Sequence, residues 1–385
     1  MSSTAEIGIV GGGVAGCAAA IALARSGRSV VVFERTEYEH TRIGETLPPR
    51  ARLLLEQLGV WQDFRRDGHS PSSGSLAAWG SEELHENQFL FNPYGSGWHL
   101  DRRKFESRFA QWAEEAGARV LRNVRVKDIR SLDGRGWCVD VECAIKRESI
   151  DCDVVVDASG RASFVARRLG AERIDYDELV AVYAFLRAPT DSNDTRTLVE
   201  ATRDGWWYSS YLPNAGLVAA FMSDANSLPG GARLLQVFWQ QQLEATTYTR
   251  GRADSACRVG KVHTIRANSY RMSAPIGENW LAIGDAAMAF DPLSSQGLYN
   301  ALKSAIEASR DLQQHFSGDR TGLSNYSTWV QQRFRRFLEM RSAYYSRETR
   351  WRDSAFWRRR VGGRQHEHDQ ESSVGSRVSL DVAQG

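Results

Sequence analysis

Apolar and polar residues follow two different patterns along this chain. Near its start, the apolar segment Glu6–Val10 predicts a strand, the alanine-rich stretch after it predicts a helix, and "SVVVFER" predicts a second strand. Later, "LVAVYAFLRA", "GWWYSSYLP" and "GLVAAFMSD" show the two-residue alternation and the β-branched and aromatic content of half-buried strands. We therefore expect an α/β (α+β) fold that combines a strand–helix–strand unit with a small antiparallel sheet.

Composition and charge narrow the class of protein. The chain has 385 residues, of which 42% are hydrophobic, and a formal net charge of +2. This length predicts two domains or one large interleaved domain, and the balanced charge gives no support for binding nucleic acid or a membrane surface. The five cysteines are scattered without a CxxC pair, which favours reduced thiols in a cytoplasmic protein. The apolar run 7–24 predicts neither a signal peptide nor a membrane helix, because five glycines interrupt it and no positive charge precedes it.

The first strand–helix turn carries a nucleotide-binding fingerprint. Gly11, Gly13 and Gly16 form GxGxxG directly after the first predicted strand. The first glycine permits a tight turn, the second lets the backbone approach a pyrophosphate, and the third lets the helix pack against the strand. Glu34 ends the second strand about 20 residues later, where its carboxylate can accept hydrogen bonds from ribose hydroxyls. The sequence therefore predicts a bound adenine dinucleotide, without deciding between NAD and FAD.

Four further sequence motifs follow this turn along the chain. They are "GETLPP" at 44–49, the helix start with Arg102 and Phe105, "GRASFVAR" at 160–167, and "GDAAMAFDPLSSQG" at 284–297. In this order and spacing the chain resembles the flavoprotein monooxygenase and flavin-dependent halogenase superfamily over about its first 310 residues. The resemblance implies a p-hydroxybenzoate hydroxylase-like fold, related to the tryptophan halogenase branch. In such a fold a Rossmann-like FAD-binding domain is interleaved with an antiparallel substrate-binding sheet and followed by C-terminal helices.

The resemblance also implies the cofactor and its contacts. In the superfamily the arginine of the RxxF helix approaches the ribityl and phosphate region, and the aspartate of GDA accepts a hydrogen bond from the ribityl chain. The backbone after the proline of the last motif cradles the pyrimidine edge of the flavin ring. The cofactor is therefore expected to be FAD. The residues expected to bind it are Gly11, Gly13, Val14, Ala15, Gly16, Glu34, Arg35, Glu45, Arg102, Val126, Gly284, Asp285, Pro292, Gln296, Gly297 and Leu298.

The chain departs from the halogenases at the residues that handle the halogen. In that branch a lysine after the GES or GET loop captures hypohalous acid, whereas the first lysine here is Lys104, on the RxxF helix. Tryptophan-type halogenases carry a glutamate two residues after the proline of the last motif, where this chain has Ser294. The halogenase signature WxWxIP is reduced to "GWWYSSYLP". These differences disfavour halogenation.

The chain also departs from the single-component aromatic hydroxylases. It has "ASG" where they have "ADG", so Ser159 replaces an aspartate that is associated in that family with FAD and reduced nicotinamide. Electrons are therefore expected either from reduced nicotinamide or from a separate flavin reductase. The motifs "GETLPP", "GWWYSSYLP" and "DPLSSQG" are most similar to those of flavoproteins that modify tryptophan in other proteins during the maturation of protein-derived quinone cofactors.

The motifs divide the chain into interleaved parts. We expect an FAD-binding domain at 1–70, 99–171 and 262–312, a substrate-binding β-sheet domain at 71–98 and 172–261, a C-terminal helical region at 313–360, and a disordered tail at 361–385. No metal site is predicted, and "HEH" at 366–368 lies in the tail.

The candidate catalytic residues come from three motifs. Glu45 lies in the GET loop, which should hold its carboxylate close to the flavin or the substrate. Trp206 and Tyr208 share one face of their predicted strand, and that face either lines a pocket for an aromatic ring or packs within the sheet. Ser294 and Ser295 follow the proline of the last motif. No residue is predicted to be an indispensable acid or base, because an electron-rich ring needs little activation toward an electrophilic oxidant.

The predicted activity is FAD-dependent hydroxylation of an electron-rich aromatic ring through a flavin hydroperoxide. The substrate is an indole or phenol as a small molecule, or a tryptophan within a peptide or protein, and a flavin reductase is a further partner. The alternatives are a flavin-dependent halogenase, a flavoprotein oxidase or dehydrogenase, and a non-catalytic FAD-containing maturation factor. The segment 333–360 interleaves arginines with aromatic residues and predicts a basic helix that either packs on the FAD-binding domain or docks an acidic partner.

Overall fold

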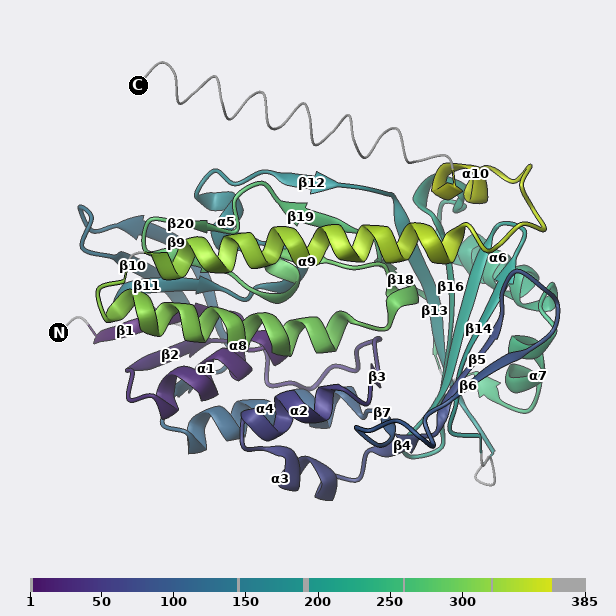
Figure 1. Cartoon of the computed structure of the whole chain (residues 1–385), viewed down its shortest axis with the longest axis horizontal. Coiled ribbons are helices and arrows are strands. Elements are labelled where there is room, and N and C mark those ends of the chain that lie inside the picture. Colours follow the sequence, from purple (N-terminus) through teal and green to yellow (C-terminus); the bar gives the residue numbers. More distant parts are fainter. Residues whose placement is uncertain (1–2, 144–145, 190–193, 259, 320, 362–385) are drawn as a thin grey trace, which may run out of the picture.

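Two large sheets form the framework of the molecule (Figure 1). The computed structural model describes residues 3–143, 146–189, 194–258, 260–319 and 321–361. One sheet carries the nucleotide-binding turn, and a mostly antiparallel sheet stands at the other end of the molecule. The expected α/β fold with a Rossmann-like unit, an antiparallel sheet and C-terminal helices is confirmed, whereas the domain bounds stay a prediction. The predicted tail 361–385 lies outside the described residues, apart from Val361.

The first sheet is built around parallel strands. Its strands are β1 (Ser3–Val10), β2 (Val30–Phe33), β8 (Arg119–Leu121), β9 (Val124–Ser131), β10 (Trp137–Cys143), β11 (Lys146–Asp157), β20 (Ile276–Gly277) and β21 (Trp280–Ala282). They run in the order β20–β21–β11–β1–β2–β8, with β10 pairing β11 and β9 pairing β10. All four residues of β2, with the sequence VVVF, are buried, as expected for a strand that is covered on both faces.

Helices cover one face of this sheet and extend toward the second sheet. Side chains of α1 (Val14–Arg25), α4 (Arg102–Glu115) and α8 (Gly297–Phe316) form one core with those of β1 and β2. The long helix α9 (Thr321–Tyr345) lies along α8 and ends beside the second sheet, where α10 (Ala355–Val361) follows (Figure 1). Within the described residues, no helix is long and apolar enough to cross a membrane.

The second sheet has two differently covered faces. Its strands are β5 (Gly74–Ala78), β6 (His85–Gln88), β13 (Leu179–Arg187), β14 (Thr197–Thr202), β15 (Gly205–Leu212), β16 (Gly216–Asp224), β17 (Cys257–Arg258) and β18 (His263–Arg266). They run in the order β17–β13–β16–β15–β14–β5–β6, with β18 also pairing β13. Trp207 packs with Trp239 of α6 (Ala232–Glu244) on one face, and Trp206 and Tyr208 belong to a different core on the opposite face. The predicted alternation of these aromatic residues is therefore confirmed.

Strand β16 lies between β13 and β15 in the second sheet, although β15 lies between β13 and β16 in the sequence. The reason is the short turn 213–215, which folds β16 back directly onto β15, with Leu212 opposite Gly216. A short turn makes consecutive antiparallel strands neighbours.

Smaller elements lie between the two large sheets and around them. One three-stranded sheet contains β3 (Thr46–Leu47), β4 (Ser70–Ser72) and β7 (Gly97–His99), and another contains β12 (Arg173–Asp175), β19 (Tyr270–Met272) and β22 (Met288–Ala289). The remaining helices are α2 (Ala51–Gln57), α3 (Trp61–Arg66), α5 (Phe164–Arg168) and α7 (Tyr248–Asp254), with 3-10 turns η1 (Gly160–Ala162), η2 (Ala225–Ser227), η3 (Gly284–Ala286) and η4 (Pro292–Ser294).

Candidate flavin and substrate site

The turn between β1 and α1 has the shape that its glycines predict. Gly11 has a φ of +108°, and a Cβ at Gly16 would lie 2.0 Å from the carbonyl oxygen of Gly11, so neither position accommodates a side chain. A Cβ at Gly13, by contrast, would meet no heavy atom within 4 Å. Gly13 is the N-cap of α1 and supplies no capping side chain, so the first N–H groups of the helix remain available to an anion.

Glu34 is fixed at the end of β2 beside this turn. Its carboxylate accepts hydrogen bonds from the backbone N–H of Gly12 at 2.8 Å and of Thr36 at 2.9 Å. The backbone carbonyl of Glu34 accepts from Val124 at 2.8 Å, which places β9 and its residue Val126 near the same corner. Arg35, the next residue, is exposed. The predicted adenosine-binding residues therefore lie around one corner of the first sheet.

Arg102 connects the RxxF helix to the GET loop. It is the first residue of α4, and its guanidinium donates to the backbone carbonyls of Gly44 at 2.6 Å and Ile43 at 3.2 Å. It also bonds to Glu106 one turn later. Its buried Nε atom has no hydrogen-bond partner among the described residues. Buried N–H donors are seldom left unpaired, so Arg102 is suited to hold an additional acceptor such as a phosphate or a ribityl hydroxyl.

The closing motif brings an aspartate to the same region. β21 ends at Ala282, and Gly284 and Asp285 lie in the 3-10 turn η3 that follows it. The Asp285 side chain is 39% exposed and lies 3.8 Å from the guanidinium Nε of Arg161. Tyr270 donates its hydroxyl to the Asp285 carbonyl at 2.5 Å, which fixes the turn. Asp285 is thus held in place while its carboxylate stays accessible.

The loop after Pro292 prepares the N-terminus of α8. Ser295 adopts the left-handed region with φ of +50°, and Gln296 is an N-cap residue that makes no side-chain cap bond. Leu298 is buried beneath the first turn, and a Cβ at Gly297 would meet nothing within 4 Å. The open end of a 20-residue helix is therefore presented to the site, where its dipole favours negative charge.

These features fit FAD. The open position at Gly13 leaves room for a pyrophosphate, and that at Gly297 leaves room for a ring edge. The free Nε of Arg102 is a hydrogen-bond donor, and the accessible carboxylate of Asp285 is an acceptor. All of them come from the residues that the sequence selected for the cofactor. The individual contacts to FAD stay predictions.

Glu45 is a buried carboxyl group beside the aromatic face of the second sheet. Glu45 is 1% exposed, and its Oε1 atom has no hydrogen-bond partner among the described residues. Burial raises the pKa of Glu45 to about 7, although the charge of Arg102 and a hydrogen bond from the Gly44 N–H oppose this rise. Tyr208 lies against Glu45, and its hydroxyl is 2.9 Å from Oγ1 of Thr46. A carboxyl with a pKa near neutrality can both accept and return a proton.

Trp206 takes part in a different, fully buried network. Its indole N–H donates to the hydroxyl of Tyr345 at 2.9 Å, and that hydroxyl donates to Asp291 at 2.8 Å. Asp291 in turn accepts from the backbone N–H of Leu293 at 2.9 Å, at the start of the loop before α8. Trp206 is 1% exposed and therefore packs within the sheet, the second of the two roles that its sequence position allowed. The network joins the second sheet, the end of α9 and the loop before α8.

Sequence reasoning missed Arg161, Tyr270, Asp291 and Tyr345. Arg161 and Asp291 lie inside recognised motifs and carry charge in segments that become buried, which is a usable signal. Tyr270 and Tyr345 have no local signal, because their partners are residues distant in sequence.

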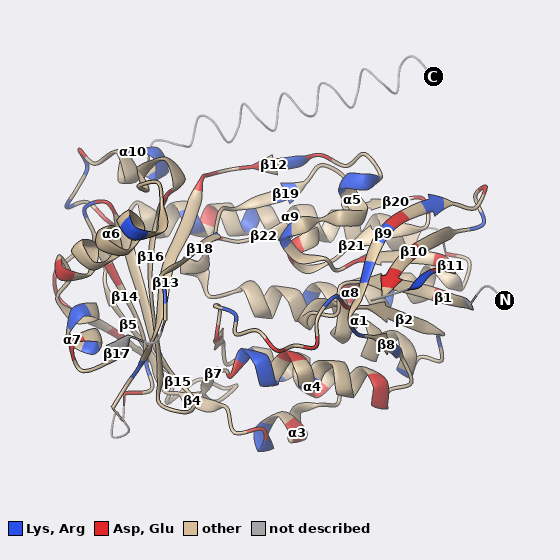
Figure 2. Cartoon of the chain, turned by 180° about the vertical axis from the view of Figure 1, so that it is seen from behind, with Lys and Arg blue, Asp and Glu red and all other residues tan. Residues whose placement is uncertain are grey.

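Four of the ten arginines in the segment 333–360 form ion pairs with carboxylates of the chain. Arg360 donates to Asp224 at 2.6 Å with a side chain that is 2% exposed, and Arg359 contacts the same carboxylate at 2.8 Å. Arg341 lies 3.3 Å from Asp177. Figure 2 shows basic positions of α10 in blue, with α10 at one end of the second sheet. The pairing favours a packing role for the segment, and charge reversal at 358–360 would disturb the fold rather than test docking.

The chain matches the FAD binding domain family over residues 4–340. It therefore belongs to this family, and it is an FAD-dependent oxidoreductase of the flavoprotein monooxygenase and halogenase superfamily.

Individual proteins agree with this assignment. The chain is 28% identical over 360 residues to the protein named "Putative FAD-dependent oxidoreductase LodB" of Marinomonas mediterranea, covering 91% of this chain and 95% of that protein. The structure of the myxobacterial chondrochloren halogenase CndH superimposes with a TM-score of 0.87 at 21% identity, over 98% of this chain and 90% of the other. The peptidyl tryptophan dihydroxylase QhpG superimposes with a TM-score of 0.76 at 24% identity, over 93% and 79% of the two chains. At these identities the structural matches establish the fold alone.

Proposed function

We propose that this chain hydroxylates an electron-rich aromatic ring, an indole or a phenol, including the tryptophan side chain of a peptide or protein. The observation that carries the proposal over halogenation is the position of its lysines. A flavin-dependent halogenase needs an amine beside the GET loop to capture hypohalous acid, and this chain offers none there.

Each of the five lysines is either exposed or paired with a glutamate. They are Lys104, Lys127, Lys146, Lys261 and Lys303. Lys104 and Lys261 are exposed, and the other three form ion pairs with Glu142, Glu148 and Glu307. Burying an unpaired ammonium is costly, so a lysine that serves as a halogen carrier needs a dedicated site, and no lysine of this chain occupies one.

The residues of the site suit ring hydroxylation. Bound FAD supplies the activation of dioxygen. The N-terminus of α8 at Gly297 favours negative charge at the ring edge, while Asp285 and Arg102 hold the cofactor chain. The ring carbon that gains oxygen must lose its proton, and Glu45, with a pKa of about 7, is available to accept it. Tyr208 and Thr46 beside it provide an aromatic wall and a hydroxyl for orienting the substrate.

The structures similar to this chain include a hydroxylase and a halogenase. QhpG is by its name a peptidyl tryptophan dihydroxylase, which supports a polypeptide-bound indole as the substrate, and CndH is a halogenase. Electrons come either from reduced nicotinamide or from a separate reductase. Ser159, which replaces the aspartate of the nicotinamide-dependent hydroxylases, uses its hydroxyl to bond Asp157 at 2.6 Å and to cap the N–H of Phe164 at 2.8 Å.

The test is a single-turnover reaction. The FAD-loaded protein is reduced without oxygen, mixed with isotope-labelled dioxygen, and supplied with an indole-containing peptide, with or without chloride. We expect a transient flavin absorbance that decays faster with the peptide, and a peptide that gains one labelled oxygen whether or not chloride is present. A chlorinated peptide would assign the chain to the halogenases. Reoxidation without any change in the peptide would refute hydroxylation and favour an oxidase or a non-catalytic flavoprotein.

A further inference from the structure

Strand β6 is a short edge strand that contains Glu86 but lacks three of the usual protections, which are lysine, proline and a bulge. It pairs with β5 on one side, and no strand among the described residues pairs with it on the other. All four residues, His85 to Gln88, are exposed. Natural edge strands are commonly shielded by lysine, proline or a bulge, because free backbone groups recruit other chains. β6, with the sequence HENQ, contains no lysine or proline, and its ladder with β5 is regular.

The register shows which backbone groups of β6 face outward. Phe89 donates its N–H to the carbonyl of Ser73 at 2.8 Å, so these opposed residues form a hydrogen-bonded pair. In an antiparallel ladder such pairs alternate with non-bonded ones, so Asn87 also faces β5, while Glu86 and Gln88 direct their N–H and C=O groups away from it. Two donors and two acceptors are therefore aligned for an added strand.

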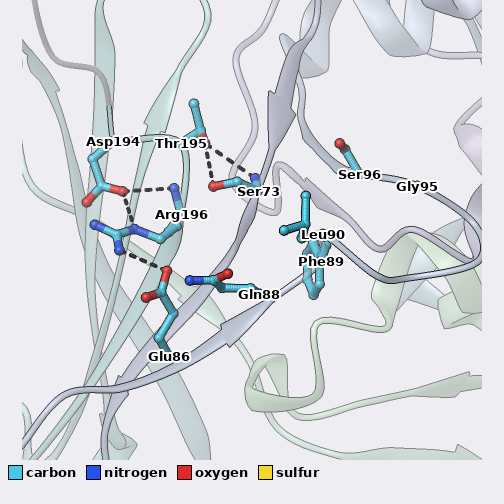
Figure 3. A pocket seen from close by; sticks show the side chains of 10 residues that line it. All are labelled: Ser73, Glu86, Gln88, Phe89, Leu90, Gly95, Ser96, Asp194, Thr195 and Arg196. Atoms are coloured by element: carbon cyan, nitrogen blue, oxygen red, sulfur yellow. Dashed lines mark hydrogen bonds and ion pairs between the residues drawn. The ribbon is translucent and has the colours of Figure 1, made fainter.

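An open groove and two apolar side chains adjoin this edge. The groove, of about 500 Å³, is lined by residues of β6, of the loop that follows it, and of the segment 194–196 before β14 (Figure 3). Leu90 and Phe91 come directly after β6 and are 76% and 94% exposed. Exposed apolar side chains beside a groove are typical of surfaces that bind another polypeptide.

Among β6, the turn before it and the lining of the groove, carboxylates outnumber cations, with Glu82, Glu83, Glu86 and Asp194 against Arg196. Between Arg66 and Arg102 the chain has no lysine or arginine, and Glu82, Glu83 and Glu86 are exposed. Arg196 pairs with Glu86 at 2.9 Å, as Figure 3 shows. Glu82 and Glu83 have no lysine or arginine nearby in the sequence. A cationic segment therefore complements this surface better than an acidic one.

We propose that β6, together with Leu90, Phe91 and the groove, docks an extended, lysine- or arginine-bearing segment of a partner polypeptide, which adds to the second sheet as a further strand. Ser96 of the groove leads into β7, whose residue His99 lies opposite Thr46, beside Glu45. Three residues of strand span about 10 Å, so a docked segment lies within a few residues' reach of the site. The inference rests on the proposed function in one respect, which is that the docked polypeptide carries the ring to be oxidised.

Binding of a synthetic probe tests the proposal without turnover. The probe is a short peptide in which valine alternates with lysine around one tryptophan, and its binding to FAD-loaded protein is followed by fluorescence anisotropy at low salt. We expect saturable binding that slows hydrogen exchange at the amides of Glu86 and Gln88. Replacing the lysines of the probe with glutamate should weaken binding about tenfold or more. Methylating alternate backbone nitrogens of the probe should abolish it.

Matched variants locate the surface. Gln88→Pro removes an outward N–H without breaking the ladder to β5 and should abolish binding, whereas Gln88→Ala keeps the N–H and should bind normally. The double variant Leu90→Ser, Phe91→Ser should also weaken binding. The proposal is overturned if no probe binds, or if Gln88→Pro and the double variant bind like the parent. It is also overturned if β6 instead pairs with β18 of a second copy, whose residue Arg266 is exposed, seen as self-association that Arg266→Glu abolishes. A probe that docks but is not oxidised would refute hydroxylation and leave the docking surface intact.

Discussion

Replacing Glu45 with glutamine should change how stability depends on pH. Burial raises the pKa of Glu45 from 4.5 to about 7 in the folded chain, which corresponds to about 3 kcal/mol for ionising the buried group. Because the folded pKa lies above the unfolded one, the folded state holds more protons between these two values, and stability falls as pH rises through that window. Glu45→Gln removes this loss. The stability advantage of the variant over the parent should therefore grow by about 2–3 kcal/mol between about pH 5 and about pH 8.

Denaturant unfolding of the flavin-free protein at both pH values measures this difference. Comparing the two proteins at each pH cancels the contribution of all other titrating groups. Glu115→Gln, at an exposed position of α4, is the control and should unfold in parallel with the parent at both pH values. If the free energy of unfolding of Glu45→Gln changed with pH as that of the parent does, the Glu45 carboxyl would be hydrated or paired in solution. The reasoning that makes it a proton acceptor would then be wrong.

Three further changes test the cofactor site and the C-terminal packing. Gly13→Ala should weaken FAD binding about tenfold or more while leaving the melting temperature of the flavin-free protein unchanged, because its Cβ meets no protein atom within 4 Å and lies where the pyrophosphate is expected. Gly230→Ala, equally open but remote, should bind FAD normally in the same flavin-fluorescence titration. Arg360→Ala removes the buried partner of Asp224 and leaves only the half-exposed Arg359 on that carboxylate. It should cost about 1–3 kcal/mol in urea unfolding, against less than about 0.5 kcal/mol for the exposed Arg358→Ala. Tyr345→Phe keeps the ring but removes two buried hydrogen bonds, and should cost about 1–3 kcal/mol by the same measurement. If Arg360→Ala and Tyr345→Phe unfolded at the same urea concentration as the parent, the pairing described for these two residues would be contradicted.

The sequence alone determined the features that depend on neighbouring residues. GxGxxG between a strand and a helix specifies a turn that fits a pyrophosphate, because the reasons for each glycine lie within one turn of the chain. The opposite facing of Trp206 and Trp207 follows from the two-residue period of a strand. The order of the motifs likewise predicted the FAD-binding family and the fold class, which the structure and the family match confirm.

Only the tertiary structure decided what depends on contacts between distant segments. Trp206 is 139 residues from Tyr345, so nothing near either residue in the sequence signals that their hydrogen bond buries both rings. The pKa of Glu45 is set by packing against other elements, and the same glutamate on the surface would titrate normally. The arginines of the last helices look like a docking surface in sequence, but Asp224 of β16 neutralises two of them. Burial and pairing are decided by which segments meet in space, and local spacing does not encode that.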